Sequence, residues 1–312
     1  MTPLVSILIP AYNAAPWLAE AVNSARAQTH SRCEIIVIDD GSTDSTLAVA
    51  RSLAAANIRV ETQPNAGAAT ARNRALHLAQ GEFIQYLDAD DLLSPGKIAA
   101  QLSLLGTRAP DTLATCRWGR FEVKPGEARF VDDDVFRDFA PVDFLLLHLR
   151  SARMMHPAAW LVPRQVATRA GSWDERLSLN DDGEYFARVV LASAGIAFAA
   201  DPAAATYYRS GLGGSLSRRR SDRALASLAL SVSLVAGHLA AAEDSPRTRQ
   251  ARADYWQRLA YEIYPGSPAA SRQASAQARA LGGSQVTPPF GPRQQLLSRL
   301  VGWRLVRRLF SS

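Results

Sequence analysis

The chain has 312 residues, of which 47% are hydrophobic and 21% charged, a composition that predicts a folded protein of about two domains and excludes a disordered or collagen-like polymer. The net charge of +6 is unevenly placed, because residues 1–215 hold 20 basic and 24 acidic residues whereas residues 216–312 hold 15 basic and 5 acidic residues. We therefore expect an acidic working domain over 1–215 and a basic, mainly helical region over 216–312 that can meet an anionic surface.

The cysteines and the first residues bear on the compartment. Cys33 and Cys116 have no Cys or His cluster beside them, which argues against a disulfide scaffold and a thiolate zinc site. The chain begins without the basic segment and cleavage site of a secretory signal. These features favour a reducing compartment and predict a cytoplasmic protein.

The first hundred residues alternate short apolar runs with stretches of helical periodicity. This pattern predicts an α/β fold with a mainly parallel sheet flanked by helices. Gly81 is expected to close the third helix as a C-cap. The runs that predict strands are 5–9, 34–38, 58–61 and 83–87. The helical stretches between them are 17–25, 44–55 and a third that follows a turn at 65–67 and is closed by Gly81.

The rest of the chain gives weaker signals. A helix is expected near 97–105, a strand near 113–118, and a helix over 180–194 with Asn180 as its N-cap. From residue 218 the sequence predicts a C-terminal helical appendage, interrupted at 265–268 and 288–289 by proline. Residues 224–242 carry no charge over nearly the length of a membrane span, but their many Ala and Ser residues favour a buried soluble helix.

Polar side chains follow three of the predicted strands. Parallel strands end at one edge of a sheet, so these side chains should converge there. Each has an ordinary alternative as a turn or cap residue. Several carboxylates at one place repel each other unless a cation or a hydrogen-bonding ligand is present, which favours a binding site. The residues are Tyr12 and Asn13, then Asp39 and Asp40, then Asp88, Asp90 and Asp91.

The chemistry of these residues suits a nucleoside diphosphate. Asp88 and Asp90 stand two apart, a spacing that suits a divalent cation shared with phosphate oxygens. Asp39 could accept hydrogen bonds from a base or a ribose, and Arg72 could pair with phosphate or stack on a base.

Four blocks in order and spacing resemble family 2 glycosyltransferases, over roughly residues 3–215. They are Pro10-Ala11-Tyr12-Asn13, residues 37–44, residues 65–73 with Ala71-Arg72-Asn73, and Leu87-Asp88-Ala89-Asp90-Asp91. Residues 171–177 resemble the family's Gly-x-Phe-Asp-Glu-x-Leu stretch. Asp181-Asp182, followed by Arg188, is similar to the acidic pair that supplies the family's base. Tyr208-Arg209 and residues 214–217 resemble its closing segment, without the His often found there.

The resemblance implies a GT-A (Rossmann-like) fold and an inverting sugar transfer from a nucleotide donor, most often a UDP-sugar, with Mn²⁺ or Mg²⁺ as cofactor. It implies a hexosyl- or N-acetylhexosaminyl-transferase acting on a saccharide or lipid-linked saccharide, with bacterial surface polysaccharide assembly as the associated pathway. The base is assigned to Asp182, with Asp181 or Glu184 as alternatives and Arg188 in support. Nucleotide-binding residues are Pro10, Tyr12, Asn13, Asp39, Asp40, Arg72 and Asp88, and the metal ligands are Asp90 and Asp88.

Three other functions are weighed against this one. A dehydrogenase lacks its Gly-x-Gly-x-x-Gly turn here, and a sugar nucleotidyltransferase lacks its Gly-rich phosphate loop. A non-catalytic nucleotide-sugar-binding protein stays open, because the usual Glu-Asp pair is Asp-Asp. In the middle segment, isolated aromatic and His side chains are expected in the core rather than in a pocket. They are Trp118, His148, His156 and Trp160.

Residues 293–310 interleave arginine with apolar side chains. Drawn as one helix over 293–310, most arginines gather on one side, but Arg299 falls among the apolar residues. The sequence favours a helix lying on an anionic inner membrane, and a terminal helix packed on its own domain is the alternative. No groove-reading motif accompanies the charge, so nucleic acid is not expected.

Overall fold

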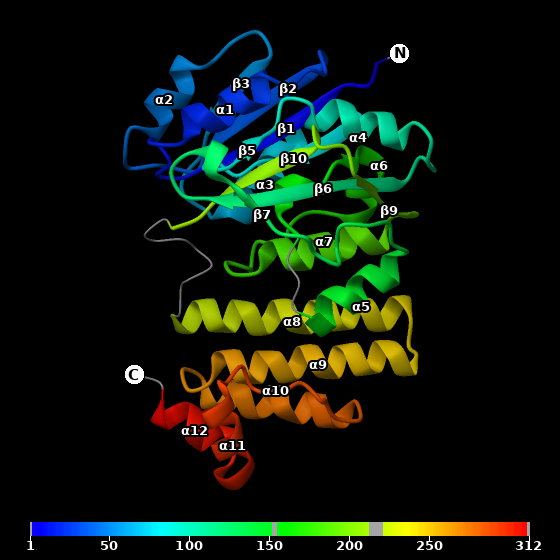
Figure 1. Ribbon diagram of the computed structural model, residues 1–312. Helices are drawn as coiled ribbons and strands as arrows, with labels where there is room; N and C mark the ends of the chain where they lie inside the picture. The colour runs from blue at the N-terminus through cyan, green and yellow to red at the C-terminus, as the bar shows by residue number, and fades with distance from the viewer. Residues whose placement is uncertain (1, 152–154, 212–220, 311–312) are drawn as a thin grey trace. The chain divides into compact units, whose positions relative to one another are not determined.

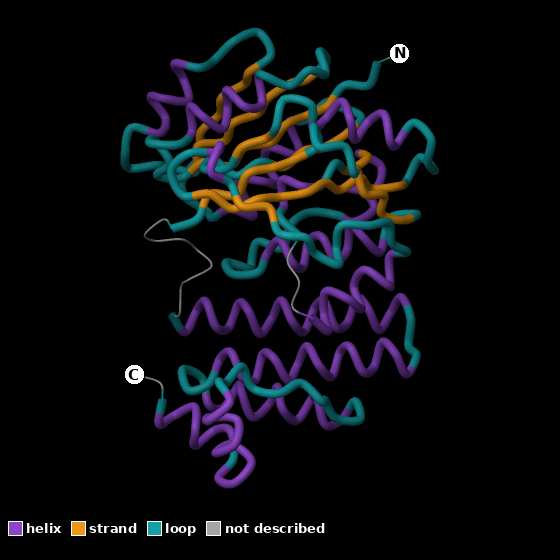
Figure 2. Tube along the Cα trace, viewed as in Figure 1, coloured by secondary structure: helices purple, strands orange, loops and turns teal. Residues whose placement is uncertain are grey.

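The computed structural model describes residues 2–151, 155–211 and 221–310 and divides into two compact units. The first comprises Met1–Phe144, Met154–Glu175 and Arg188–Gly213, and it holds every described strand (Figure 2). The second comprises Leu145–Arg153, Arg176–Ala187 and Gly214–Ser312, and its described elements are helices.

The main sheet of the first unit has the order β3-β2-β1-β4-β8, with β8 antiparallel to β4 and the other pairs parallel. Figure 1 shows β3, β2 and β1 side by side. Its inner strands are apolar on both faces because helices cover them. The four expected strands are confirmed, each within two residues of its predicted ends. The strands are β1 (Val5–Ala11), β2 (Cys33–Asp39), β3 (Ile58–Thr62), β4 (Phe83–Tyr86) and β8 (Val162–Pro163).

Helices follow the strands as the periodicity predicts, with corrected boundaries. The helix expected over 44–55 covers only 46–52. Gly81 was expected as the C-cap of the third helix, but that helix ends at Leu78. Gly81 instead lies against β1, where its N–H donates to Ser6 Oγ at 2.8 Å. A Cβ there would come within 2.6 Å of the Ser6 nitrogen, so close approach to β1 requires glycine. The helices are α1 (Leu18–Arg26), α2 (Thr46–Ser52), α3 (Ala68–Leu78) and α4 (Lys97–Leu105).

A second sheet completes the first unit. It has the order β5-β10-β6-β7, and β9 also pairs with β6. The strand predicted at 113–118 is the middle of β6, while the two-residue strands and the helices near them were not predicted. These elements are β5 (Leu92–Leu93), β6 (Thr112–Phe121), η1 (Pro125–Glu127), β7 (Arg129–Phe130), η2 (Pro157–Ala159), α6 (Arg164–Ala170), β9 (Gly195–Ala199) and β10 (Ala205–Arg209).

In the second unit α8 packs on α9, and α9 packs on α10. One buried apolar cluster contains Leu228 of α8, Leu259 of α9 and Ala274 of α10. Among the described residues α8 is the one helix long and apolar enough to cross a membrane, and half of its most apolar stretch is buried. Its Ser227 and Ser231 hydroxyls donate to the carbonyls of Leu179 and Asn180 at 3.1 and 2.9 Å. The helices are α5 (Pro141–Ser151) and α7 (Asp181–Leu191), which begin or end in the first unit, then α8 (Asp222–Ala242), α9 (Pro246–Ile263), α10 (Pro268–Ala280), α11 (Pro292–Val301) and α12 (Trp303–Leu309).

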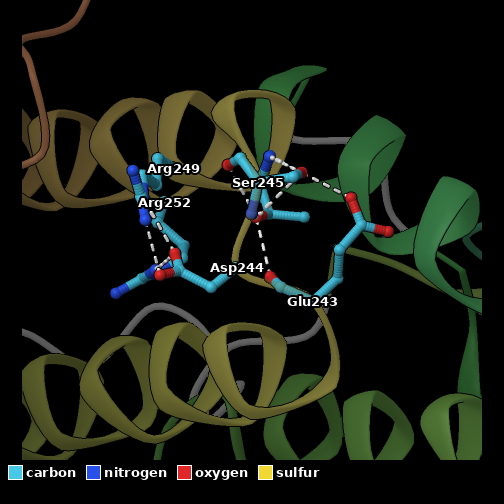
Figure 3. A network of polar contacts seen from close by, with 6 residues as sticks. Glu243, Asp244, Ser245, Arg249 and Arg252 are labelled. Atoms are coloured by element: carbon cyan, nitrogen blue, oxygen red, sulfur yellow. Dashed lines mark hydrogen bonds and ion pairs between the residues drawn. The ribbon is translucent and has the colours of Figure 1, made fainter.

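The breaks at 265–268 and 288–289 are confirmed, but two others were not predicted. Between α8 and α9 the Ser245 side chain accepts from the Thr248 N–H and the Thr248 hydroxyl accepts from the Ser245 N–H, a reciprocal cap (Figure 3). The Arg249 guanidinium donates two hydrogen bonds to the Asp244 carboxylate, at 2.8 and 2.7 Å. The single helix expected over 293–310 is two helices, separated at Gly302, whose φ of 82° favours glycine.

Candidate functional site

The carboxyl ends of β2, β1 and β4 lie side by side. Ala11 at the end of β1 pairs with Asp39, and Leu8 pairs with Tyr86 at the end of β4. The loops that follow these strands therefore leave the sheet at one edge, as the sequence predicted. They bring together the three groups of polar residues at 12–13, 39–40 and 88–91.

The first two loops are hydrogen bonded to each other. Asn13 has a φ of 49°, and its side-chain oxygen accepts from the Thr43 N–H at 2.8 Å. The Asn13 N–H donates to Ser42 Oγ at 3.0 Å. Pro10 is half-buried within β1, whereas Tyr12 is 48% exposed. Asn13 thus fixes the loop, and the Tyr12 ring remains open to a stacking partner.

Asp39 has one carboxylate oxygen that is buried without a hydrogen bond. The residue is 1% exposed, and its Oδ2 accepts from the Thr62 hydroxyl at 3.0 Å. Its Oδ1 has no partner among the described residues. Buried acceptors are almost always satisfied, so this oxygen calls for a donor from outside the described residues.

Asp40, the neighbouring residue, is fully engaged with the loop before α3. Its two oxygens accept from Gln63 Nε2 at 2.7 Å, Asn65 Nδ2 at 3.1 Å, the Ala66 N–H at 3.0 Å and the Gly67 N–H at 2.8 Å. Four donors fill the acceptor sites of one carboxylate. This geometry gives the Asp40 side chain a positioning role for the loop.

Asp88 forms an ion pair with Arg72, 2.8 Å from its terminal nitrogen to Oδ1, with 30% and 8% of the side chains exposed. The Arg72 guanidinium lies 4.5 Å from the centre of the Trp173 ring. Burial raises the pKa of Asp88, but the charge and hydrogen bond of Arg72 lower it more, so the net pKa is lowered. Asp88 is therefore ionised at neutral pH.

Asp90 and Asp91 differ in their environment. Burial, together with the carboxylates of Asp91 and Asp88, raises the pKa of Asp90 to about 7. Asp91 Oδ1 accepts from the Arg209 N–H at 2.7 Å, and its Oδ2 lies 2.7 Å from His156 Nε2. Burial lowers the pKa of the His156 imidazole, but the Asp91 carboxylate raises it more. Both carboxylate oxygens of Asp91 thus interact with other residues of the protein. The ionised form of Asp90, in contrast, is disfavoured by burial and by its charged neighbours.

A divalent cation fits Asp88 and Asp90 only with ligands from elsewhere. Among residues 2–151, 155–211 and 221–310 no three His, Cys, Asp or Glu side chains form a metal site. Burial first, and then the carboxylates of Asp91 and Asp88, raise the pKa of Asp90, and a bound cation would favour its ionised form. One or two carboxylates with phosphate oxygens and water is a common shell for Mg²⁺.

The segment 171–175 is tied to α3. Asn73 donates to the Trp173 carbonyl at 3.0 Å and accepts from the Trp173 N–H at 2.8 Å. Arg188 donates to the Ser172 carbonyl at 2.8 Å and to the Ala170 carbonyl. Two of the resembling blocks, 71–73 and 171–177, therefore meet, and they place Trp173 on Arg72.

Several residues of the site had not been singled out for a role in it. The Arg209 guanidinium donates to the Asp90 carbonyl at 2.9 Å and to Glu20 at 2.5 Å. His156 was expected in the core and is buried there, 1% exposed, but as the partner of Asp91. No local pattern marks a pair separated by 65 residues. Trp160 is buried as expected, while Trp118 and His148 are half-buried.

The acidic residues assigned to the base lie in the second unit, on the first turn of α7. Asp181 and Asp182 are half-buried, and Asp182 Oδ1 accepts from the Gly183 N–H at 2.8 Å. Glu184 is 2% exposed and lies 2.9 Å from His238 Nε2. Asn180, with a φ of 57°, donates to Ser231 at 2.7 Å. Residues 214–217 of the expected closing segment lie outside the described residues.

Residues 6–150 match the sequence model described as Glycosyl transferase family 2. An uncharacterized glycosyltransferase of Rickettsia typhi is 34% identical over 182 residues, which cover 58% of this chain and 57% of the relative. The chondroitin synthase of Pasteurella multocida is 45% identical over 98 residues, covering 31% of this chain and 10% of the synthase. The chain thus spans little more than half of the first relative and a tenth of the second.

Solved structures share the fold. The crystal structure of S. aureus TarS 1-349 in complex with UDP-GlcNAc has a TM-score of 0.72 at 17% identity, covering 99% of this chain and 91% of that 1-349 chain. The mannosyltransferase PcManGT from Pyrobaculum calidifontis, in complex with GDP-Man and Mn²⁺, has a TM-score of 0.55 at 18% identity, covering 100% of this chain and 84% of that one. The expected GT-A fold is confirmed, and residues 6–150 of the chain are similar to glycosyltransferase family 2.

Proposed function

We propose that the chain is an inverting glycosyltransferase that moves a sugar from a UDP-sugar to a hydroxyl of a saccharide or lipid-linked saccharide. The observation that carries the donor half is Asp39 Oδ1, a buried acceptor without a partner among the described residues. It lies at the sheet edge from which the Asp88 and Asp90 loop also leaves. A base N–H or a ribose hydroxyl would satisfy it, and the UDP-GlcNAc complex of TarS supports uridine.

Asp88 and Asp90 would hold Mn²⁺ or Mg²⁺ at the diphosphate end of the donor. When bound, such a cation neutralises the charge that develops on the departing diphosphate. Arg72 keeps Asp88 ionised and in place, and Arg209 and Asp91 fix the backbone of the loop that carries Asp90. The Mn²⁺ complex of PcManGT supports this assignment.

The Asp182 carboxylate acts as the base, an assignment that rests on the family resemblance. It takes the proton of the acceptor hydroxyl while that oxygen bonds to the anomeric carbon. The bond from this carbon to the diphosphate breaks, and UDP leaves with the electron pair. One displacement from the opposite face inverts the anomeric centre. Glu184 is the weaker alternative because it is buried against His238.

The acceptor is a growing or lipid-linked polysaccharide handled at the cytoplasmic face of a membrane. The similarity to a chondroitin synthase supports a polysaccharide product. A hexosyl or N-acetylhexosaminyl group is the sugar transferred.

UDP binding by the Asp39→Asn variant tests the donor site. The amide keeps the size of the side chain but replaces a charged acceptor, so we expect UDP affinity to fall about tenfold in calorimetry. Asp132→Asn is the matched control, because that side chain is 97% exposed. UDP affinity equal to wild type in Asp39→Asn would refute the site.

UDP release from a panel of UDP-sugars tests the reaction. Asp182→Asn should bind UDP as wild type does and release none from a UDP-sugar, and turnover near wild type would move the base elsewhere. Excess EDTA should stop transfer and added Mn²⁺ should restore it. Donor binding without turnover, under every acceptor tried, would favour the sensor that the sequence left open.

A further inference from the structure

The last two helices carry an apolar surface that no part of the described chain covers. Seven large apolar side chains there are between 41% and 77% exposed, against four others in the rest of residues 2–151, 155–211 and 221–310. We call this surface the α11–α12 face. It consists of Leu296, Leu297, Leu300, Val301, Leu305, Leu309 and Phe310.

Because the chain breaks at Gly302, the side chains of α11 are considered on a helix of their own. At about 100° per residue, its four apolar side chains share one side of the helix, and Arg299 points about 130° from their mean direction. Arg299 fell among the apolar residues only when 293–310 was drawn as one helix. No residue of α11 is buried. The helix therefore presents an apolar side over residues 296–301, with Arg299 outside it and Arg293 in the same direction one turn earlier in the helix.

One side of α12 is anchored. Val306 is 1% exposed, and the Trp303 ring lies 4.7 Å from that of Tyr261 in an edge-to-face contact. Leu305 and Leu309, on the same helix, are 46% and 67% exposed. One side of α12 thus packs on its own unit, as the alternative of a packed terminal helix predicts. Another side of α12 leaves leucine exposed.

The charge of this region selects the partner. No acidic residue follows Glu262 in the sequence, whereas seven arginines do. A second copy of the chain would bring two positive surfaces together, which is unfavourable. Nucleic acid would match the charge but leave the leucines in water. An anionic lipid surface accepts both, with apolar side chains among the acyl chains and arginines at the phosphates. The arginines are Arg272, Arg279, Arg293, Arg299, Arg304, Arg307 and Arg308.

We propose that the α11–α12 face docks the protein on an anionic phospholipid surface. This inference goes beyond the proposed transfer reaction and does not depend on it, because no residue of the donor site takes part.

Co-sedimentation of the full chain with vesicles tests the proposal. We expect wild type to pellet with vesicles of phosphatidylglycerol and phosphatidylcholine in equal parts, to stay in solution with phosphatidylcholine alone, and to detach as salt is raised. Leu300→Ser with Leu305→Ser, and separately Arg299→Glu with Arg308→Glu, should each weaken partitioning at least about tenfold.

Control variants make the same kinds of change, apolar to serine and arginine to glutamate, at exposed positions away from the α11–α12 face. Val123→Ser removes a 72% exposed apolar side chain of the first unit, and Arg51→Glu with Arg223→Glu reverses two exposed charges. Both should pellet like wild type. All variants change exposed positions, and unchanged circular dichroism confirms that each is folded.

Three results would overturn the proposal. One is wild type that remains in solution with the anionic vesicles. Another is partitioning of either paired α11–α12 variant equal to that of wild type. The third is a dimer, detected by light scattering without lipid, that Leu300→Ser with Leu305→Ser converts to monomer, since the face would then belong to a second copy.

Discussion

Removal of the Arg72 side chain is the sharpest test of how the site is held together. Arg72→Ala leaves the Asp88 carboxylate without its 2.8 Å partner and takes the cation from the face of Trp173. Only 8% of the Arg72 side chain and 30% of the Asp88 side chain are exposed, so water replaces little of what is lost.

The expected loss follows from these exposures. Breaking a buried ion pair by removing one partner costs about 3–5 kcal/mol, and a cation over an aromatic ring adds about 1 kcal/mol. Since Asp88 keeps some contact with water, we take the low end and expect Arg72→Ala to lower the free energy of unfolding by about 3 kcal/mol. Asp88→Asn in the Arg72→Ala background should restore about 1 kcal/mol or more, because it removes the uncompensated charge.

Urea unfolding followed by tryptophan fluorescence measures these changes. Arg59→Ala is the matched control, because Arg59 also lies 2.8 Å from a carboxylate, that of Glu61, but is 52% exposed. An exposed pair of this kind contributes at most about 1 kcal/mol. Equal losses in Arg72→Ala and Arg59→Ala, or no recovery in the double variant, would refute the reasoning from burial.

Three further predictions concern the two units. Burial lowers the pKa of Lys97 to about 8, from 10.5 when unfolded, so between these values the unfolded chain binds more protons and stability rises with pH. Urea unfolding at pH 7.5 and pH 10 should show wild type gaining about 2 kcal/mol relative to Lys97→Met, and parallel curves would contradict it. Gly41→Ala should cost about 2 kcal/mol and weaken UDP binding in calorimetry, because φ is +69° and a Cβ would meet the Asn65 backbone nitrogen at 2.6 Å. Ser245→Ala removes the cap of α9 and should cost about 1 kcal/mol in thermal unfolding, whereas the exposed Ser52→Ala should cost little.

The sequence predicts the main sheet well because long apolar runs and helical periodicity agree with each other. β1, β2 and β4 are buried along their inner residues, so their composition alone marks them. β5 and β7 have two residues each, too short for any period to show. The break between α8 and α9 depends on a reciprocal cap at Ser245. It was not predicted because the residues around it are good helix formers.

Pairs that cross the chain explain what the sequence misses in the site. The position of Asp91 after an apolar run predicts that it lies at the sheet edge, but the 65 residues between it and His156 hold no pattern that predicts their contact. Likewise, Arg72 was expected on phosphate or a base, and the structure places its guanidinium on Asp88 and Trp173. Such contacts are set by how separate elements pack, and packing is not a local property of sequence.

Asp39 and Asp40 show the same limit at neighbouring positions. Both follow one apolar run, and nothing local separates their roles. In the fold, consecutive side chains leave a strand on opposite sides. Asp40 turns to the loop before α3, where four donors saturate it, while Asp39 keeps a buried oxygen without a partner among the described residues. A carboxylate saturated by its own protein has no lone pair left for a ligand, so we propose that a ligand at this edge of the sheet would use Asp39, rather than Asp40, as its acceptor.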